Sequence, residues 1–381
     1  MIYLNNAATS FPKPQAVIDA VNSCLMSPPF HSGRTGFERE KDDIVYLCRE
    51  NLAKLFNFDD PLRVLFTSGS TEALNLALKG IKLEGSHVVT TEIEHNSVIR
   101  PLKTMELNGI IELTFVKCDE NAYVEPENIE KAIRPNTKAI VVNHCSNVTG
   151  TILDVQKIAE IAHKHNCLII VDASQSAGNV PIDFKNWGLD MLAFTGHKSL
   201  WGMSGIGGLL VRDGIELEPL KVGGTGTYSE ILTQPKGFPI YYEAGTPNTP
   251  GIVSLQAGVE HLLSIGLDEI RTHKKKLFEI ILNELDGYPG ITHYNHTDKT
   301  SYANFCFNVE NMVPEEVGYI LESSYEIMVR TGLHCAPLLL GALGVHPWGT
   351  VRASASYFTK ENEVLEFIEA IKVVSKMVKR K

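Results

Sequence analysis

Residues 138–175, KAIVVNHCSNVTGTILDVQKIAEIAHKHNCLIIVDASQ, carry the pattern from which the fold can be predicted. The β-branched runs KAIVVNHC (138–145) and CLIIVDASQ (167–175) flank the helix-like segment VQKIAEIAHKHN (155–166). Apolar runs of this kind are typical of strands that are buried on both faces and covered by crossover helices. The stretch therefore predicts two parallel strands joined by a helix.

The same pattern extends in both directions along the chain. RVLFTSGSTEALNLALKG (63–80) and HVVTTEIEHNSVIRPLKTMEL (87–107) each predict a strand, a turn and a helix. DMLAFTGHK (190–198) and GIGGLLVRD (205–213) predict two further strands. We therefore expect a mainly parallel α/β sheet with ligand-binding groups at the carboxyl ends of its strands.

The pattern changes after about Pro250, where a smaller α+β domain is expected. Its expected elements are a long helical region over 252–285, a strand at FCFNVE, a helix near 314–324, strands near IMVRTG and TVRASA, and a final helix from Lys360. The preceding segment, VGGTGTYSEILTQPKGFPIYYEAGTPNTPG (222–251), is too long and too rich in turn residues for a simple connector. It predicts an active-site or subunit-contact loop.

Composition limits the classes of function. The chain has 381 residues, is 44% hydrophobic and carries a net charge of −10, so it can form two domains with sizeable cores. The acidic balance argues against nucleic-acid binding, which requires a basic face. No apolar stretch approaches the roughly 20 residues that span a membrane. The first residues, MIYLNNAATSFPKP, lack the basic and apolar regions of a signal peptide, so we expect a cytoplasmic protein.

The seven cysteines are scattered along the chain, which is typical of free thiols rather than of a disulfide framework. There is no CxxC pair, and neither His144–Cys145 nor His334–Cys335 has a partner at zinc-finger spacing. We therefore expect no metal site. Cys335, in RTGLHCAPLLL (330–340), leaves three alternatives from its neighbours alone: a buried core thiol, a metal ligand or a reactive nucleophile.

Three stretches place chemically active groups just after predicted strands. TSGSTEALN (67–75) predicts a helix N-terminus that binds phosphate, although Ser70 or Thr71 could equally be an ordinary cap. Asp172 follows a buried strand, where a carboxylate needs a partner: a cofactor ring nitrogen, an internal cation or a helix N-terminus. Lys198, beside a strand end, could form a Schiff base with a carbonyl cofactor, or be a surface lysine.

Taken in order, these motifs resemble a known family, the class V, fold-type I pyridoxal-phosphate enzymes. Within that family the chain most resembles the group II cysteine desulfurases and selenocysteine lyases. The resemblance covers essentially the whole chain. The motifs that carry it are TSGSTEALN, EIEHNSV, NHCSNVTG, VDASQSAG, TGHKSLWG, EAGTPNT, RTGLHCAP and TVRASASYF.

The resemblance implies a large cofactor-binding α/β domain at 15–255, with a seven-stranded type of sheet. It implies a smaller α+β domain made of 1–14 and 256–381. It also implies a homodimer, because Thr246 resembles the residue that reaches the cofactor phosphate of the neighbouring subunit.

The resemblance also implies roles for the cofactor residues. Lys198 would hold pyridoxal phosphate as a Schiff base and then act as the acid–base group at the substrate Cα. Asp172 would pair with the pyridinium nitrogen. Gln175 would hydrogen-bond the phenolic oxygen, and His95 would stack on the ring. The residues implied to hold the phosphate are Ser70, Thr71, Thr195 and His197.

For the substrate, the resemblance implies that Asn147 and Arg352 hold the carboxylate, with Arg330 beside them. Cys335 would attack the substrate sulfur, helped to ionise by Arg330 or His334. The expected reaction converts L-cysteine to L-alanine and leaves a persulfide on Cys335. A sulfur-acceptor protein would collect the persulfide for iron–sulfur cluster assembly, tRNA thiolation or another pathway.

Three alternatives remain open from the sequence: a selenocysteine lyase, a class V aminotransferase or other cysteine-derivative lyase, and a sulfur carrier without turnover. Two segments depart from the family pattern. The loop His31–Glu38 has Thr35 where the family has a second histidine, and GVHPWG (344–349) has no clear counterpart. Cys145 adjoins Asn147 and is expected to be a buried structural thiol.

Overall fold

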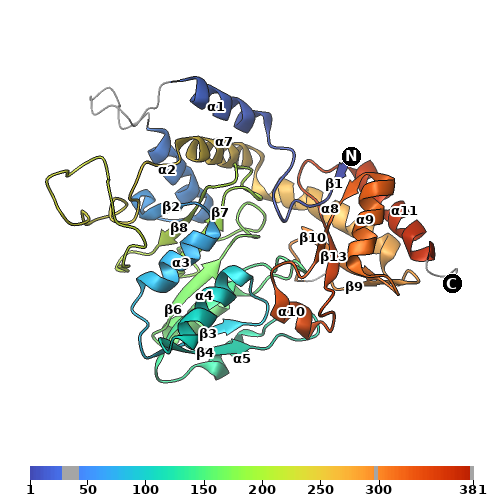
Figure 1. Ribbon diagram of the computed structural model, residues 1–381, viewed down its shortest axis with the longest axis horizontal. Helices are drawn as coiled ribbons and strands as arrows, with labels where there is room; N and C mark the ends of the chain where they lie inside the picture. Colours follow the sequence, from blue (N-terminus) through green and yellow to red (C-terminus); the bar gives the residue numbers. More distant parts are fainter. Residues whose placement is uncertain (28–42, 296–298, 378–381) are drawn as a thin grey trace.

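The computed structural model describes residues 1–27, 43–295 and 299–377, so the His31–Glu38 loop lies outside the described residues. Its largest sheet has seven strands in the order β2-β8-β7-β6-β5-β3-β4 (Figure 1). Neighbours from β4 to β7 pair in parallel, and β8 runs antiparallel to β7 and β2. The predicted mainly parallel sheet is confirmed. The strands are β2 (Val64–Thr67), β3 (Ser86–Thr91), β4 (Ile111–Val116), β5 (Thr137–Asn143), β6 (Leu168–Asp172), β7 (Met191–Thr195) and β8 (Gly207–Val211).

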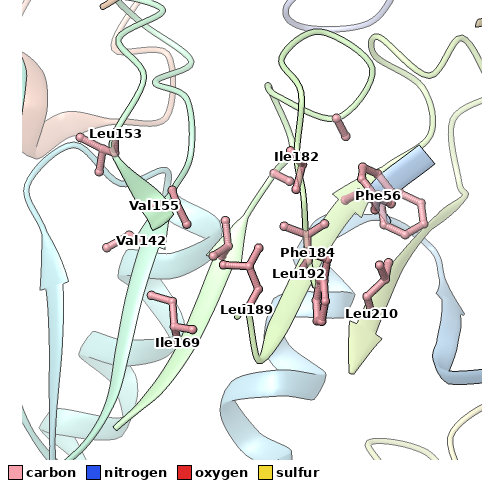
Figure 2. Close-up of a cluster of buried hydrophobic side chains, with 14 of the residues drawn as sticks. Phe56, Val142, Leu153, Val155, Ile169, Ile182, Phe184, Leu189, Leu192 and Leu210 are labelled. Atoms are coloured by element: carbon pink, nitrogen blue, oxygen red, sulfur yellow. The ribbon is translucent and has the colours of Figure 1, made fainter. Parts of the chain in front are cut away.

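Both faces of this sheet are buried because successive side chains of a strand point to opposite faces. One face carries Val142, Ile169, Leu192 and Leu210, from β5, β6, β7 and β8, which lie along one side of the sheet in Figure 2. The residues just before them in the chain belong to the core on the other face. Each fully buried aliphatic side chain contributes about 1.5–3 kcal/mol, so the continuous apolar runs hold the central strands firmly between two layers.

Helices cover the two faces separately. The face shown in Figure 2 packs against α2 (Ile44–Phe56), α5 (Pro126–Ala132), α6 (Val155–Lys164) and α7 (Thr249–Ile265). The opposite face packs against α3 (Ser70–Gly80) and α4 (Asn96–Leu107). The chain thus forms three layers, and the strands β2, β3, β5, β6 and β7 are each followed by a turn at the edge where the site is found.

A second core is built on a smaller sheet near both ends of the described chain (Figure 1). This sheet has the order β12-β13-β10-β9, and a two-stranded sheet pairs β1 with β11. The strands are β1 (Ile2–Tyr3), β9 (Ile291–His293), β10 (Asn304–Val309), β11 (Ile327–Met328), β12 (Arg330–Gly332) and β13 (Thr350–Ser354). The helices of this region are α8 (Leu267–Leu285), α9 (Pro314–Tyr325), α10 (Pro337–Ala342) and α11 (Glu361–Met377). Of these, α10 packs in the core of the large sheet through Leu339 and Leu340. The expected α+β character of this region is confirmed.

The long helical region expected over 252–285 is two helices. Gly266 interrupts it with a φ of +88°, a left-handed conformation that favours glycine, and its N–H caps α7 at Leu262. The break lets α7 pack on the large sheet while α8 packs on the second core through residues such as Leu277 and Ile281.

The link between β8 and α7 contains no helix or strand. The segment 212–248 runs from β8 to α7 through turns and bends, and α1 (Gln15–Met26) contacts α7. The expected domain bounds, 15–255 for the large domain and 1–14 with 256–381 for the small one, stay a prediction. Within the described residues, no helix has the length and apolar character needed to cross a membrane.

Candidate active site

A cavity of about 210 Å³ lies where the large sheet meets the small one. Side chains from both sheets and from the N-terminal segment line it. The predicted site residues that line it are Ser70, Thr71, His95, Asn147, Asp172, Gln175, Thr195, His197, Lys198, Arg330 and Arg352. Two predicted residues do not line it, Cys335 and Thr246.

The turn after β2 presents the start of α3 to the cavity. Gly69 is the N-cap residue and makes no side-chain capping bond, so Ser70 and Thr71 begin the helix with amide groups free to face a ligand. The turn fits closely against β8, because a Cβ on Gly207 would lie 2.7 Å from the Cα of Gly69. This end of the cavity is therefore suited to an anion such as a phosphate.

His95 is held in one orientation by its own helix. It is the N-cap of α4, and its Nδ1 accepts a hydrogen bond from the backbone N–H of Ser97 at 3.0 Å. The Ser97 hydroxyl lies 2.9 Å from this Nδ1 and 2.8 Å from the hydroxyl of Thr71. Burial lowers the pKa of His95 to about 4, so its ring is neutral at physiological pH. Ser97 therefore links the anion-binding turn to the histidine.

Asp172 ends the buried strand β6 and is 4% exposed. Its Oδ1 accepts hydrogen bonds from the backbone N–H of Ser174 at 2.9 Å and from the Ser174 hydroxyl. The next side chain on the cavity wall, Gln175, donates through Nε2 to the carbonyl of Ala7 at 2.9 Å. The carboxylate is thus fixed at a strand end inside the cavity, as the sequence predicts.

Lys198 follows β7 in a turn that depends on a glycine. A Cβ on Gly196 would lie 2.8 Å from Ile206, so only glycine lets the chain pass here. Burial lowers the pKa of Lys198 from 10.5 to about 8, partly offset by Asp172. A buried amine of this kind is neutral in a useful fraction of molecules near neutral pH.

His197 anchors the N-terminal segment to this turn. Its carbonyl accepts hydrogen bonds from the Ser10 N–H at 3.0 Å and from the Lys13 ammonium at 3.0 Å. Burial lowers the pKa of the His197 ring to about 4, and its buried Nδ1 has no partner in the described chain.

Two arginines face the cavity from adjacent strands. Arg330 of β12 and Arg352 of β13 are direct cross-strand neighbours. Arg352 is 1% exposed, and its described partners are neutral oxygens: the carbonyl of Asn147 at 2.6 Å and Oδ1 of Asn5 at 3.4 Å. Burial, followed by the charge of Arg330, lowers the pKa of Arg352 to about 9. Like charges directly opposite each other are destabilising, so the pair is suited to an anionic ligand.

Cys335 lies at the edge of the cavity, on the turn between β12 and α10. Its Sγ is 3.6 Å from Nη2 of Arg330, and its carbonyl accepts a hydrogen bond from the Asn96 N–H at 2.8 Å. The side chain is half-buried. The later 344–349 turn packs back against the same region, since a Cβ on Gly349 would lie 2.1 Å from the carbonyl oxygen of Gly332. Cys335 is therefore in direct contact with a guanidinium that lines the cavity.

The two residues expected to help Cys335 ionise, Arg330 and His334, have different surroundings in the structure. Arg330 contacts the sulfur, but His334 does not supply a positive charge. Its ring is buried, its Nε2 bonds to Thr350, and burial holds its pKa well below the ordinary value. The hypothesis that His334 helps Cys335 to ionise required its side chain to point toward the sulfur, and the Nε2 of the ring bonds to Thr350 instead.

Several cavity residues were not predicted from the sequence: Ala7, Ala8, Ser97, Asn143 and Ser174. Ser97 and Ser174 each stand two residues after a predicted site residue, His95 or Asp172, and each donates its backbone N–H to that side chain. That spacing is the one signal that could have identified them. Cys145 also lines the cavity, and it is the buried thiol that was expected, with burial raising its pKa to about 11.

The cavity fits a phosphorylated pyridine aldehyde such as pyridoxal phosphate. It has an uncapped helix start, a buried carboxylate and a buried amine, at Ser70, Asp172 and Lys198. Two buried nitrogen atoms of residues that line it, Nδ1 of His197 and Nε of Arg352, have no partner in the described chain. Buried polar groups normally find partners, so these atoms are consistent with a bound anionic ligand.

Comparisons with known proteins agree with this geometry. Residues 2–367 match the family model "Aminotransferase class-V". The chain is 33% identical to a "Probable cysteine desulfurase" of Methanothermobacter thermautotrophicus, over 99% of this chain and 95% of the relative. It is 34% identical to one of Halalkalibacterium halodurans, over 95% of this chain and 90% of the relative.

Among solved structures, the apo cysteine desulfurase of Thermococcus onnurineus NA1 superposes with a TM-score of 0.91 at 30% identity, over 98% of this chain and 94% of that one. The matches extend through both sheets and through all the cavity-lining motifs. The chain therefore belongs to the class V aminotransferase family of pyridoxal-phosphate enzymes, and within it to the cysteine desulfurases.

Proposed function

We propose that the protein converts L-cysteine to L-alanine and collects the sulfur as a persulfide on Cys335. The observation that carries this proposal is the contact between Cys335 Sγ and the Arg330 guanidinium, which lines the same cavity as Lys198 and Arg352. A thiol, a buried amine and an arginine pair are the three groups that such a reaction requires.

Pyridoxal phosphate, when bound, supplies an electron-accepting ring conjugated to the substrate Cα. Asp172 would hold the ring nitrogen, and His95 would lie against the ring face. Ser70 and Thr71 would bind the phosphate at the start of α3. The cofactor site would be completed by three other residues that line the cavity: Gln175, Thr195 and His197.

The arginine pair would orient the amino acid. A planar carboxylate can accept two parallel hydrogen bonds from a guanidinium, which fixes its direction as well as its charge. Arg352 is the better anchor because it is fully buried and its Nε has no partner among the described residues. Asn147 lies beside it, and its carbonyl holds Nη1 of Arg352. The substrate Cα would then lie between this anchor and Lys198.

Lys198 would move the proton at Cα. The amine must be neutral to accept a proton and charged to return one, so a pKa near 8 suits both steps close to neutral pH. Without burial the amine would be charged in nearly every molecule.

Cys335 would attack the substrate sulfur as a thiolate. A sulfur–sulfur bond forms, the substrate Cβ–S bond breaks, and the bonding electrons pass to the carbon fragment. Protonation of that fragment gives alanine. The sulfur remains on Cys335 at the persulfide level, half-exposed, from which a thiol of an acceptor protein can take it.

The experiment that tests this is incubation of the holoenzyme with L-cysteine, followed by mass spectrometry. A gain of one sulfur atom mapped to Cys335 is the expected result. The Cys335→Ser variant should bind the cofactor normally, as judged by its absorption spectrum, yet release no alanine from L-cysteine. Cys145→Ser is the control, because Cys145 lines the cavity but is buried. Full activity of Cys335→Ser would disprove the assignment.

A homodimer in the cytoplasm is part of the same proposal. Thr246 lies outside the cavity of its own chain and is exposed, in a segment that also exposes Val222, Tyr228 and Leu232. These features suit a surface covered by a second copy whose phosphate Thr246 would reach. The free cysteines are typical of a reducing compartment. Sedimentation analysis tests the dimer, and Thr246→Ala should weaken cofactor binding.

A further inference from the structure

His334 and Cys335 share an unusual backbone conformation. Their φ angles are +48° and +59°, in the left-handed region that residues other than glycine rarely adopt. Two consecutive residues of this kind persist only where surrounding contacts hold them. The turn that carries Cys335 is therefore fixed by its surroundings rather than by its own preference.

The side chain of His334 makes one set of these contacts. The ring is 2% exposed, and its Nε2 lies 3.1 Å from the carbonyl oxygen and 3.0 Å from Oγ1 of Thr350. A carbonyl oxygen can only accept, so Nε2 carries the proton and the neutral ring donates. Thr350 is two residues before Arg352 on β13, so both side chains lie on the same face of that strand.

The main chain of the turn makes the other contacts. The carbonyl of His334 accepts a hydrogen bond from Nδ2 of Asn147 at 2.7 Å, and that of Cys335 accepts one from the Asn96 N–H at 2.8 Å. The carbonyl of Asn147 in turn holds Nη1 of Arg352. Both the Cys335 turn and Arg352 are thus connected to Thr350 on β13 and to Asn147.

We propose that His334 is a positioning residue that clamps the left-handed turn to Thr350 and so keeps the Cys335 sulfur at a fixed distance from Arg352. This rests on the proposed function, in which Arg352 anchors the substrate carboxylate and Cys335 attacks the sulfur. In cysteine bound as one rotamer about the Cα–Cβ bond, the distance from carboxylate to sulfur is fixed. The clamp sets the matching distance in the protein, and it contributes geometry rather than charge.

The test compares His334→Leu with His334→Gln in the holoenzyme. Leucine fills the space but removes the donor, whereas glutamine keeps an N–H donor near the position of Nε2. For the leucine variant, kcat on L-cysteine should fall about 10- to 100-fold, the usual effect of a small misplacement. Its KM should stay within about twofold of the wild type, because Arg352 is untouched. Glutamine should restore most of the rate.

Hydrogen exchange supplies a readout that does not depend on the reaction. The Ala336 N–H donates to Leu333 and the Asn96 N–H donates to Cys335, so both amides report on the turn. Both should exchange faster in His334→Leu and at the wild-type rate in His334→Gln. Thr350→Val, which removes one of the two acceptors, should give a smaller change in the same direction, and Thr350→Ser should give none.

Each outcome decides the matter. Unchanged exchange and kcat in His334→Leu would overturn the proposal, as would faster exchange with an unchanged kcat. Suppose that both His334→Leu and Thr350→Val raised the KM, weakened the cofactor absorption and lowered the thermal stability together. The clamp would then be merely structural, and this result would also overturn the proposal. If Cys335→Ser kept full activity, the proposed function would fail instead, while the exchange data would still show whether the ring holds the turn.

Discussion

Lys274 is a buried cation whose effect on stability can be worked out from the structure. It lies on α8, is 3% exposed, and donates to Oδ1 of Asn179 at 2.6 Å. This partner is neutral, and burial lowers the pKa of Lys274 from 10.5 to about 8. The folded protein therefore binds this proton less tightly than the unfolded chain does, and keeping the proton at neutral pH opposes folding.

The size and sign of the effect follow from the two pKa values. Each pH unit of difference is worth about 1.4 kcal/mol, so at pH 7 the buried charge costs about 3 kcal/mol. Between pH 8 and 10.5 the folded protein has lost the proton while the unfolded chain keeps it, so the cost declines as pH rises. Above 10.5 both states are neutral and the cost is absent. Lys274→Met, which has no charge, lacks this term at every pH.

We therefore expect the stability of Lys274→Met relative to wild type to decrease by about 2 kcal/mol as pH rises from 7 to 10. Losing the hydrogen bond to Asn179 changes the stability of the variant by the same amount at every pH. The quantity that tests the prediction is therefore the change with pH of the stability difference between variant and wild type. Urea unfolding of the holoenzymes at pH 7, 8, 9 and 10 gives it. Lys275→Met is the matched control, because this next residue on α8 has a side chain 51% exposed and should show no such trend. A pH-independent difference for Lys274→Met would refute the reasoning.

Three further predictions concern the site and its supports. Arg352→Lys should raise the KM for L-cysteine about 10- to 100-fold, because a lysine loses one of two charge-assisted hydrogen bonds worth about 1.5–3 kcal/mol; an unchanged KM would count against the carboxylate anchor. Glu94→Gln should gain stability relative to wild type as pH rises from 4.5 to 8, because burial raises the pKa of Glu94 to about 8 and the folded wild type must keep that carboxyl protonated. Urea unfolding of both proteins across this pH range measures the effect. The same pH dependence of stability in both would contradict it. Gly349→Ala should destabilise by about 2–4 kcal/mol, since its Cβ would meet the Gly332 carbonyl at a φ of +81°; an unshifted urea midpoint would contradict it.

The large sheet could be predicted because its strands are buried on both faces. Runs such as Leu168–Asp172 have to be apolar throughout, and that composition is visible without any tertiary information. Asp172 and Lys198 were expected at strand ends for the same reason, but each stretch alone left a structural alternative open, and only the ordered set of motifs pointed to a cofactor. The motifs that carry chemistry thus stood at strand ends, where the cavity is found.

Other features depend on distant parts of the chain and could not be predicted. The neutral state of His334 follows from its burial against Thr350, sixteen positions away on another strand. The pairing of Arg330 with Arg352 requires the register of β12 and β13. The break at Gly266 did have local signals, a glycine followed by Asp268 and Glu269, which favour a new helix start. The apolar pattern continued across Gly266, so the sequence predicted one helical region instead of two helices.

The N-terminal segment has a consequence for how the enzyme is made. Ala7 and Ala8 line the same cavity as Arg352, and the neighbouring Asn6 N–H donates to the carbonyl of Ser354 at 3.2 Å. These groups are some 350 residues apart in the chain, so a ribosome releases them at very different times. The central sheet can fold on the nascent chain, as N-terminal units generally do. β13 follows every strand of the large sheet in the chain, so its wall of the cavity can be added only after that whole sheet has been synthesised.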